Sequence, residues 1–277
     1  MVLGIALLLI NLVGLSTSLR PAVVSDAEFL FEQDLTLDFE SAFVRLQRFP
    51  DQDDGAFVKN AVVVISQAIG HGWPVEQSKA FHLTVPLTEN YLLFTLAHVG
   101  PAIQWATNIP VGDVYRNYEF YNWRKALERG VGLCSQHAII LDGVLQRAGI
   151  DARIVRLEGH VLNEVTLRES GDIWLADADY GLTIPLSLKE AELNTPIVKG
   201  FYEQTISDVV LLDELAKVYG EEGNELLSSA GDYLGGPYVF IETASYLLKW
   251  LLPLLLLVGG ATVLRYKASH QAVKPDQ

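Results

Sequence analysis

The strongest periodic pattern of apolar residues in the chain lies between Ala138 and Ala148. Its apolar side chains recur at intervals of three and four residues, which places them on one face of a helix. Gly149 follows at the position where a glycine commonly ends a helix, and Gly130 and Gly132 stand before the pattern. The sequence therefore predicts a largely buried helix over residues 134–148.

Three short strands are predicted directly after this helix. Residues 152–157, 160–167 and 172–176 are rich in apolar and β-branched residues, and the second of these segments alternates with a period of two. Residues 168–171 have the composition of a turn, and connections this short join antiparallel neighbours. The pattern predicts an α+β fold in which the helix packs on an antiparallel sheet.

Further helices are expected on both sides of this core. The spacing of apolar residues predicts them over residues 25–49, 56–70, 89–99, 186–192 and 205–219. Ser25 is expected to cap the first of these helices. Residues 101–110, rich in proline and asparagine, are expected to form a connection toward the core.

Both ends of the chain are apolar enough to indicate contact with a membrane. Residues 2–19 carry no charge, so residues 1–19 are interpreted as a transmembrane anchor or a signal peptide. Residues 244–264 form a second apolar run and are predicted to be a transmembrane helix. Its one charge, Lys249, lies near the end of the run, where its side chain is expected to snorkel toward water.

The basic residues beyond this run predict an orientation. They recur in the tail, residues 265–277, and basic flanks favour the cytoplasmic side of a membrane. We therefore expect a membrane-embedded chain with a cytoplasmic tail. Its main domain, residues 20–240 with a core at about 115–185, is expected to be extracytoplasmic, either periplasmic or extracellular.

Composition narrows the class of protein further. The formal net charge is −14, which argues against a nucleic-acid partner because such partners select basic surfaces. The chain has one cysteine, Cys134, so an intrachain disulfide and a cysteine-rich zinc module are both excluded. No cofactor is expected.

Cys134 stands at the start of the predicted buried helix. A helix N-terminus carries partial positive charge and unpaired N–H groups, a setting that favours the nucleophilic thiolate. Alternatively, Cys134 is a small buried apolar residue. The strands favour the first interpretation, because His160 begins one strand while Asp177 and Asp179 follow the next at the same end of the sheet. A thiol, an imidazole and a carboxylate would converge there as nucleophile, base and orienting group.

The register of the hairpin decides which aspartate would meet His160. A turn centred on residues 170–171 would place Asp179 nearer to it along the strand. A turn centred on residues 168–169 would place Asp177 directly opposite. Both aspartates would point to the same face, since strand side chains alternate. We favour Asp177, because the residues after it have the composition of a turn that leaves the sheet.

Three motifs, GLCSQHA, GHVLNEV and WLADADYG, resemble the core of transglutaminase-like proteins, which share their fold logic with papain-like cysteine proteases. The resemblance covers roughly residues 115–185. Glu164 follows His160 by four residues, as is frequent in that family. Asp177 follows Trp174 by three residues, whereas the family usually has four.

The resemblance implies a transglutaminase-like or papain-like core with a catalytic triad of Cys134, His160 and Asp177. It implies hydrolysis or acyl transfer at an amide or ester bond of a protein or peptide substrate, as in a protease, amidase, deamidase or crosslinking enzyme. The aromatic run at residues 115–123 would line a substrate cleft or pack inside the domain.

Two other interpretations remain open. The first is a non-catalytic scaffold or binding module that contacts partner proteins of a cell-envelope system. The second is a metal site built from Cys134, His137 and His160 with a carboxylate.

Overall fold

The computed structural model describes residues 1–20, 32–71, 83–220 and 223–271. These residues group into two units. The terminal-helix unit contains Met1–Ser18, Thr84–Tyr118 and Phe240–Gln277, and the sheet unit contains Leu19–Leu83 and Glu119–Val239. Residues expected to form one domain, 20–240, thus contribute to both units.

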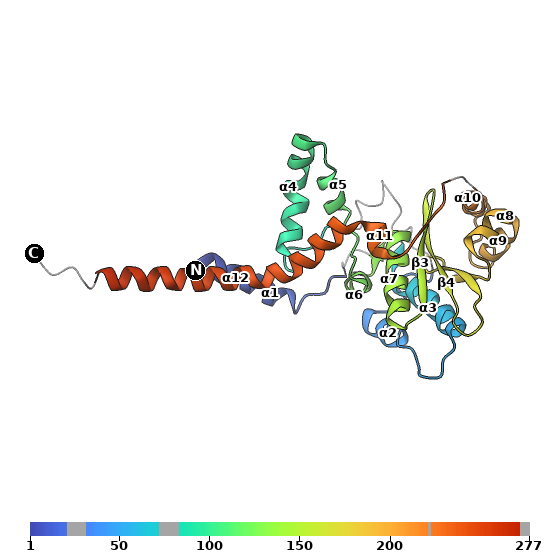
Figure 1. Ribbon diagram of the computed structural model, residues 1–277, viewed down its shortest axis with the longest axis horizontal. Coiled ribbons are helices and arrows are strands. Elements are labelled where there is room, and N and C mark those ends of the chain that lie inside the picture. Colours follow the sequence, from blue (N-terminus) through green and yellow to red (C-terminus); the bar gives the residue numbers. More distant parts are fainter. Residues whose placement is uncertain (21–31, 72–82, 221–222, 272–277) are drawn as a thin grey trace, which may run out of the picture. The chain divides into compact units, whose positions relative to one another are not determined.

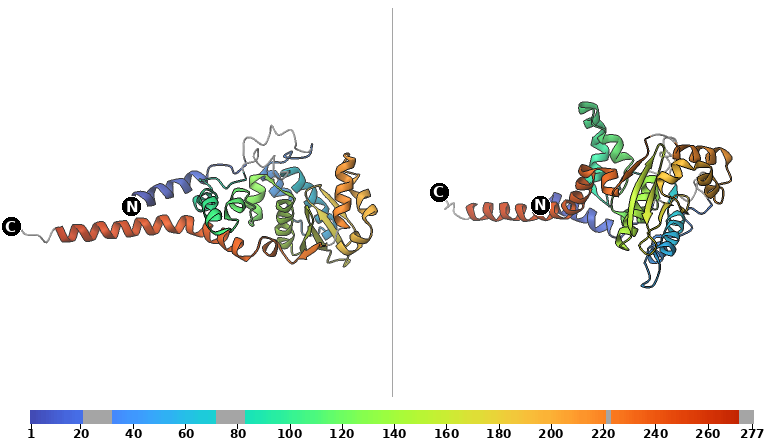
Figure 2. Two further views of the ribbon diagram at one scale, coloured as in Figure 1. Left: turned by 90° about the horizontal axis from the view of Figure 1, so that it is seen from above. Right: turned by 45° about the vertical axis from the view of Figure 1, so that its right-hand side comes forward.

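The terminal-helix unit contains α1 (Val2–Gly14), α4 (Tyr91–Thr107), α5 (Val111–Arg116) and most of α12 (Gly236–Gln271). Among the described residues, α12 is the one helix long and apolar enough to cross a membrane, over Gly236–Lys267. This segment includes the predicted span, residues 244–264. The apolar helix α1 is shorter, with 13 residues, and it runs alongside α12 (Figures 1 and 2).

Small residues let α1 and α12 approach closely. A Cβ atom on Gly4 would lie 2.8 Å from the carbonyl oxygen of Pro253, and Gly260 of α12 is as tightly packed against the start of α1. Small residues at such contacts are typical of helix pairs in membranes. Asn11 adds a polar contact, because its side-chain amide donates to the backbone oxygen of Lys249 at 2.5 Å.

Lys249 does not snorkel as the sequence predicted. Its side chain is buried, donates to the backbone oxygen of Glu89, and has its Nζ 3.8 Å from Glu89 Oε1. A buried ammonium requires partners of this kind, because desolvating an unpaired charge costs several kcal/mol. The pair therefore joins α12 to the segment that precedes α4.

α4 is longer than the sequence predicted. The helix continues through Pro101 to Thr107, and Asn108 then adopts a left-handed conformation with φ of 59°. Asparagine tolerates this conformation, which commonly ends helices. The connection expected over residues 101–110 is wrong in its first part, because this proline removes a backbone hydrogen bond without ending the helix.

The sheet unit is built on a five-stranded antiparallel sheet with the strand order β6-β5-β4-β3-β7. Two of its strands, β3 and β4, are labelled in Figure 1. The strands are β3 (Asp151–Leu157), β4 (His160–Thr166), β5 (Ile173–Asp177), β6 (Leu182–Ile184) and β7 (Glu225–Leu227). The first three confirm the predicted strands to within one residue at each end. The α+β class with an antiparallel sheet is also confirmed.

Helices pack on both faces of this sheet (Figure 2). On one face, α7 (Cys134–Arg147) packs through Ala138 against Ile154 and Val161. On the other face lie α8 (Leu188–Leu193), α9 (Thr195–Tyr202) and α10 (Val209–Tyr219). They share a core with the strand residues Val155, Leu162 and Leu175. The strands therefore contribute alternate side chains to two cores.

α7 confirms the predicted buried helix. It ends at Arg147, and Gly149 follows with φ of 72°, a conformation that glycine adopts without strain. The helices predicted over residues 186–192 and 205–219 correspond to α8 and α10.

The helices that precede α7 agree only in part with the sequence. α3 (Asp54–Ala68) confirms the helix predicted over residues 56–70. Of the helix predicted over residues 25–49, the described part, residues 32–49, is helical only in α2 (Phe39–Arg45), which begins after Asp38, whose side chain accepts from the Ser41 N–H at 2.7 Å. Ser25, the expected cap, lies outside the described residues. α6 (Trp123–Arg129) leads into α7, and α11 (Ala230–Leu234) follows β7.

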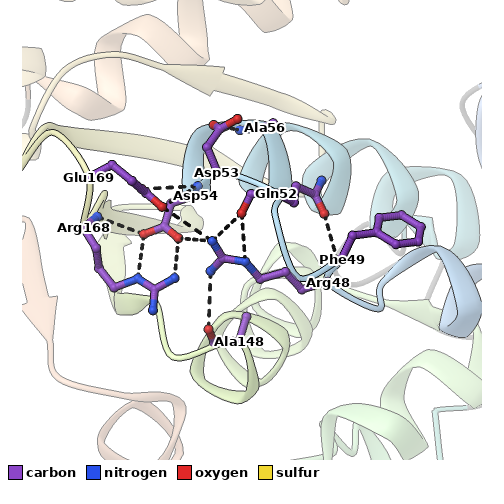
Figure 3. Close-up of polar contacts among 9 residues, drawn as sticks. All are labelled: Arg48, Phe49, Gln52, Asp53, Asp54, Ala56, Ala148, Arg168 and Glu169. Carbon is purple, nitrogen blue, oxygen red and sulfur yellow. Dashed lines mark hydrogen bonds and ion pairs between the residues drawn. The ribbon is translucent and has the colours of Figure 1, made fainter.

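A buried carboxylate fixes the start of α3 to the loop between β4 and β5 (Figure 3). Asp54 accepts from Arg168 Nε at 2.9 Å and from Arg168 Nη2 at 2.6 Å. Arg48 Nη2 lies 2.7 Å from the same carboxylate. The Arg168 guanidinium holds the pKa of Asp54 well below its usual value, despite the opposing effect of burial. The loop that determines the hairpin register is therefore anchored to a helix.

Candidate active site

Cys134 is the first residue of α7 and is partly exposed. Leu133, which precedes it, provides no side-chain cap, so the first N–H groups of the helix have no side-chain partner at that position. Gly132 packs so closely on the next turn that a Cβ atom there would lie 2.4 Å from Gln136 Cβ. A glycine is therefore required at position 132, two residues before the cysteine.

His160 and Asp177 meet at the ends of β4 and β5. Nε2 of His160 lies 2.7 Å from Oδ2 of Asp177, and both side chains are buried. The structure thus brings together the two residues that the sequence paired. It selects Asp177 over Asp179 as the partner of this imidazole.

The hairpin register differs from both alternatives considered from the sequence. Asn163 pairs with Ala176, which aligns His160 with position 179, midway between the two expected registers. The turn is centred on residues 169–170, because the Leu167 N–H bonds to the Asp172 oxygen at 2.9 Å. β5 nevertheless ends at residue 177 and the chain turns there, so the earlier aspartate reaches the ring.

Cys134 and His160 line the wall of the same cavity, and the thiol is near enough to influence the charge of the imidazole. Nε2 of His160 faces Asp177, so Nδ1 is the ring nitrogen left to exchange a proton with a thiol. Burial disfavours charge on the ring, but the Asp177 carboxylate and the Cys134 thiol outweigh burial and raise the pKa of His160 well above its usual value. The surroundings of the ring therefore favour its charged form.

Asp177 is held on both of its oxygens. Oδ1 accepts from the backbone N–H groups of Asp179 and Tyr180, at 3.0 and 3.3 Å. Oδ2 accepts from the Tyr202 hydroxyl at 2.5 Å, and that hydroxyl lies 2.8 Å from the hydroxyl of Tyr219. Burial and the neighbouring Asp177 raise the pKa of Tyr202 well above its usual value, so the hydroxyl keeps its proton and donates. The carboxylate thus has a fixed orientation.

Asp179 belongs to a different group of side chains. Its Oδ1 lies 2.5 Å from Nδ1 of His71 and 3.5 Å from Nδ1 of His137. His71 is placed there by the parallel pair of β1 (Gly70–His71) and β2 (Val131–Gly132), which sets His71 beside Gly132. The alternative metal site of Cys134, His137 and His160 is not the arrangement found, because His137 faces Asp179 and His160 faces Asp177.

Cys134 and His160 open onto one cavity of about 400 Å³. Apolar side chains form much of its wall, and Glu158 and Glu214 add two carboxylates. Tyr180 packs near the His160 ring, with 5.7 Å between ring centroids, and Tyr233 also lines the cavity. Pockets of this size and composition commonly hold small molecules or single side chains.

No family model, curated protein or solved structure matches this chain. The chemistry of the site is therefore inferred from the contacts described above.

In the aromatic run at residues 115–123, Tyr115, Tyr118 and Phe120 are buried, Tyr121 is exposed, and no residue of the run lines the cavity. Phe120 is fully buried, and its backbone N–H and oxygen bond to the side chain of Gln136 at 2.7 and 2.9 Å. Packing is therefore found for most of this run, and a place in the cavity wall is not. The aromatic wall of the cavity comes instead from Tyr180 and Tyr233.

Several residues at the site have no signal in the sequence. Tyr202 and Tyr219 lie in the helices α9 and α10, where a tyrosine hydroxyl aimed at Asp177 cannot be distinguished from an ordinary apolar helix position. Glu119 accepts from the Ser135 hydroxyl beside the cysteine. Burial raises the pKa of Glu119, although the Ser135 hydrogen bond and a nearby arginine oppose this effect.

Proposed function

We propose that the sheet unit is a transglutaminase-like cysteine enzyme that acts on amide or ester bonds. One observation carries the proposal: His160 bonds to the buried Asp177 and lines the same cavity as the partly exposed Cys134. The motifs around these residues supply the family resemblance. A buried imidazolium between a carboxylate and a partly exposed thiol is the arrangement that thiol-based acyl chemistry requires.

In the first half of the reaction, the Cys134 thiolate attacks the substrate carbonyl carbon. The carbon–sulfur bond forms, and the carbonyl electron pair moves onto oxygen, where N–H groups at the start of α7 stabilise the negative charge. Collapse of this intermediate breaks the bond to the leaving nitrogen or oxygen. The His160 imidazolium donates its proton to that leaving group, and a thioester on Cys134 remains.

In the second half, the neutral His160 accepts a proton from water or from a substrate amine. The resulting nucleophile attacks the thioester carbonyl, and the carbon–sulfur bond breaks to restore the thiolate and the imidazolium. Water as acceptor gives hydrolysis, whereas an amine gives transamidation. Asp177 fixes the orientation of the ring and stabilises its positive charge in both halves.

The cavity indicates a class of substrate. Its apolar wall favours an apolar or neutral group on the acyl side, and the carboxylates of Glu158 and Glu214 disfavour an acidic one. A protein or peptide side chain, or a short acyl chain, fits a cavity of about 400 Å³.

The proposal includes a membrane topology. α12 crosses the membrane, and the basic residues that follow its apolar part, Arg265 and Lys267, favour the cytoplasmic side. The sheet unit is then extracytoplasmic, and its substrate is a component of the cell envelope.

Trapping the thioester tests this proposal. The purified full chain in detergent would be mixed with activated esters that carry apolar, basic or acidic acyl groups, and its intact mass would be measured. We expect one acyl group on the folded wild type with apolar and basic esters. Cys134→Ser and His160→Gln should slow acylation at least a hundredfold.

Acylation of the wild type at the same rate as the His160→Gln variant would contradict the proposal. So would the absence of any adduct on a chain shown to be folded by its thermal melt, which is the result expected of a non-catalytic scaffold.

A further inference from the structure

A second group of chemically capable side chains lies within the sheet unit. His71 ends β1, His137 lies one turn after the start of α7, and Asp179 stands in the turn after β5. Three segments that are distant in the sequence thus bring two imidazoles and a carboxylate together. All three side chains are buried, at 5%, 1% and 1% of their exposure in a free residue.

The donor atoms of these residues are close enough to bind one ion. One such atom from each residue can be chosen so that all three lie within 4.8 Å of one another. Zinc binds imidazole nitrogen and carboxylate oxygen at about 2.0–2.2 Å. Small rotations of the three side chains would bring their donor atoms to these distances from an ion placed between them.

Asp179 provides a second, independent observation. Its Oδ2 is buried, and it has no hydrogen-bond partner among the residues that the structure describes. A buried carboxylate oxygen left unsatisfied costs on the order of 1–3 kcal/mol, or more when charged. A bound cation would satisfy this oxygen.

His137 is oriented as a metal ligand usually is. Its Nδ1 lies 2.9 Å from the backbone oxygen of Leu133. Metal-binding histidines almost always donate one ring N–H to a backbone oxygen or a carboxylate, which fixes the tautomer and leaves the other nitrogen to bind the metal. A His137 ring that donates from Nδ1 has Nε2 as its ligand nitrogen, while Nδ1 lies 3.5 Å from Asp179 Oδ1.

We propose that His71, His137 and Asp179 bind a divalent transition-metal ion of the zinc class. Two imidazoles favour such an ion over Ca²⁺ or Mg²⁺, which prefer oxygen ligands alone. Three protein ligands leave one coordination position open in a tetrahedral site. Because His71 also lines the cavity, this position is available to water or to a substrate oxygen.

This site uses none of the triad side chains, and the binding of an ion there does not require the proposed reaction. Neither Cys134 nor His160 belongs to the set of ligands. The ion would join β1, α7 and the turn after β5, so it would stabilise the fold whether or not the chain is an enzyme.

Direct metal measurement tests the proposal. The full chain would be purified in detergent without a histidine tag, stripped with a chelator, and titrated with Zn²⁺. We expect about one zinc ion per chain and a higher melting temperature. His71→Ala and Asp179→Asn should weaken zinc binding at least tenfold, whereas His98→Ala, which removes an exposed histidine of α4, should bind zinc as the wild type does.

A chain that binds no zinc, or variants that bind it as the wild type does, would overturn the proposal. If a variant fails to fold, the visible spectrum of the wild type loaded with Co²⁺ still tests the proposal. The wild type should show the visible bands of a cobalt site without a thiolate-to-cobalt charge-transfer band. The presence of that band would assign the ion to Cys134 instead.

Discussion

The nucleophile helix carries a buried acid whose ionisation should limit the stability of the sheet unit. Asp142 lies in the middle of α7, with 2% of its surface exposed. Its Oδ2 accepts from the Ala230 N–H at 3.1 Å and from Gln146 Nε2 at 2.9 Å, which connects α7 to α11. Its Oδ1 is buried without a hydrogen-bond partner among the described residues. Burial raises the pKa of Asp142 to about 6, although both hydrogen bonds oppose this effect.

The sign and size of the effect follow from this pKa. The unfolded chain ionises Asp142 near 3.8 and the folded chain near 6, so the unfolded state loses its proton first as the pH rises. Stability therefore falls between these two pH values and stays low above them. At 1.36 kcal/mol per pH unit, the penalty above pH 6 is about 3 kcal/mol.

Asp142→Asn should remove this penalty, because asparagine stays neutral and keeps an oxygen that accepts from the Ala230 N–H. At about pH 8 the variant should be more stable than the wild type by up to about 3 kcal/mol, which raises the melting temperature by roughly 6–12 °C for a unit of this size. The difference should disappear near pH 4. Asp151→Asn, at an exposed position, should change little at either pH.

Thermal melts of the full chain in detergent, followed at both pH values, would measure this difference. An Asp142→Asn variant that is less stable than the wild type at pH 8 would refute the reasoning. The same melting-temperature difference at both pH values would refute it as well.

Three further predictions concern the fold, the site and the membrane. Asp54→Asn should lower the unfolding free energy by about 2–3 kcal/mol in denaturant titrations, since it leaves Arg168 and Arg48 without their buried carboxylate, whereas the exposed Asp51→Asn should not. Tyr202→Phe should slow thioester formation by about tenfold or less, because it removes about 1 kcal/mol of hydrogen bonding to Asp177, and an unchanged rate would show that this hydroxyl does not orient the carboxylate. A reporter fused after the last residue should behave as cytoplasmic and one inserted near residue 53 as exported; the reverse pattern would contradict the proposed topology.

The sequence was sufficient to predict the fold in those parts of the chain where several local signals agree. The helix that begins at Cys134 combines periodic apolar residues with Gly149 just after its end, and the strands that follow alternate clearly. Their short connections also placed His160 and Asp177 at one end of the sheet. The α+β core was therefore predictable from local patterns.

The details that the sequence missed depend on contacts between distant segments. The hairpin register is associated with the anchoring of its loop by Asp54, which lies more than a hundred residues before Arg168. His71 reaches Asp179 only through the pairing of β1 with β2. Lys249 is buried because Glu89 meets it, so its position near the end of an apolar run gave the wrong expectation.

The central claim is that the His160 imidazolium holds Cys134 as a reactive thiolate. The pH dependence of alkylation by iodoacetamide tests it most directly, because Cys134 is the one cysteine of the chain and every label reports on it. In the folded wild type we expect the rate to stay appreciable below pH 7. His160→Ala should shift the profile to higher pH. A Cys134 that reacts only after denaturation, or a profile that His160→Ala leaves unchanged, would contradict the claim.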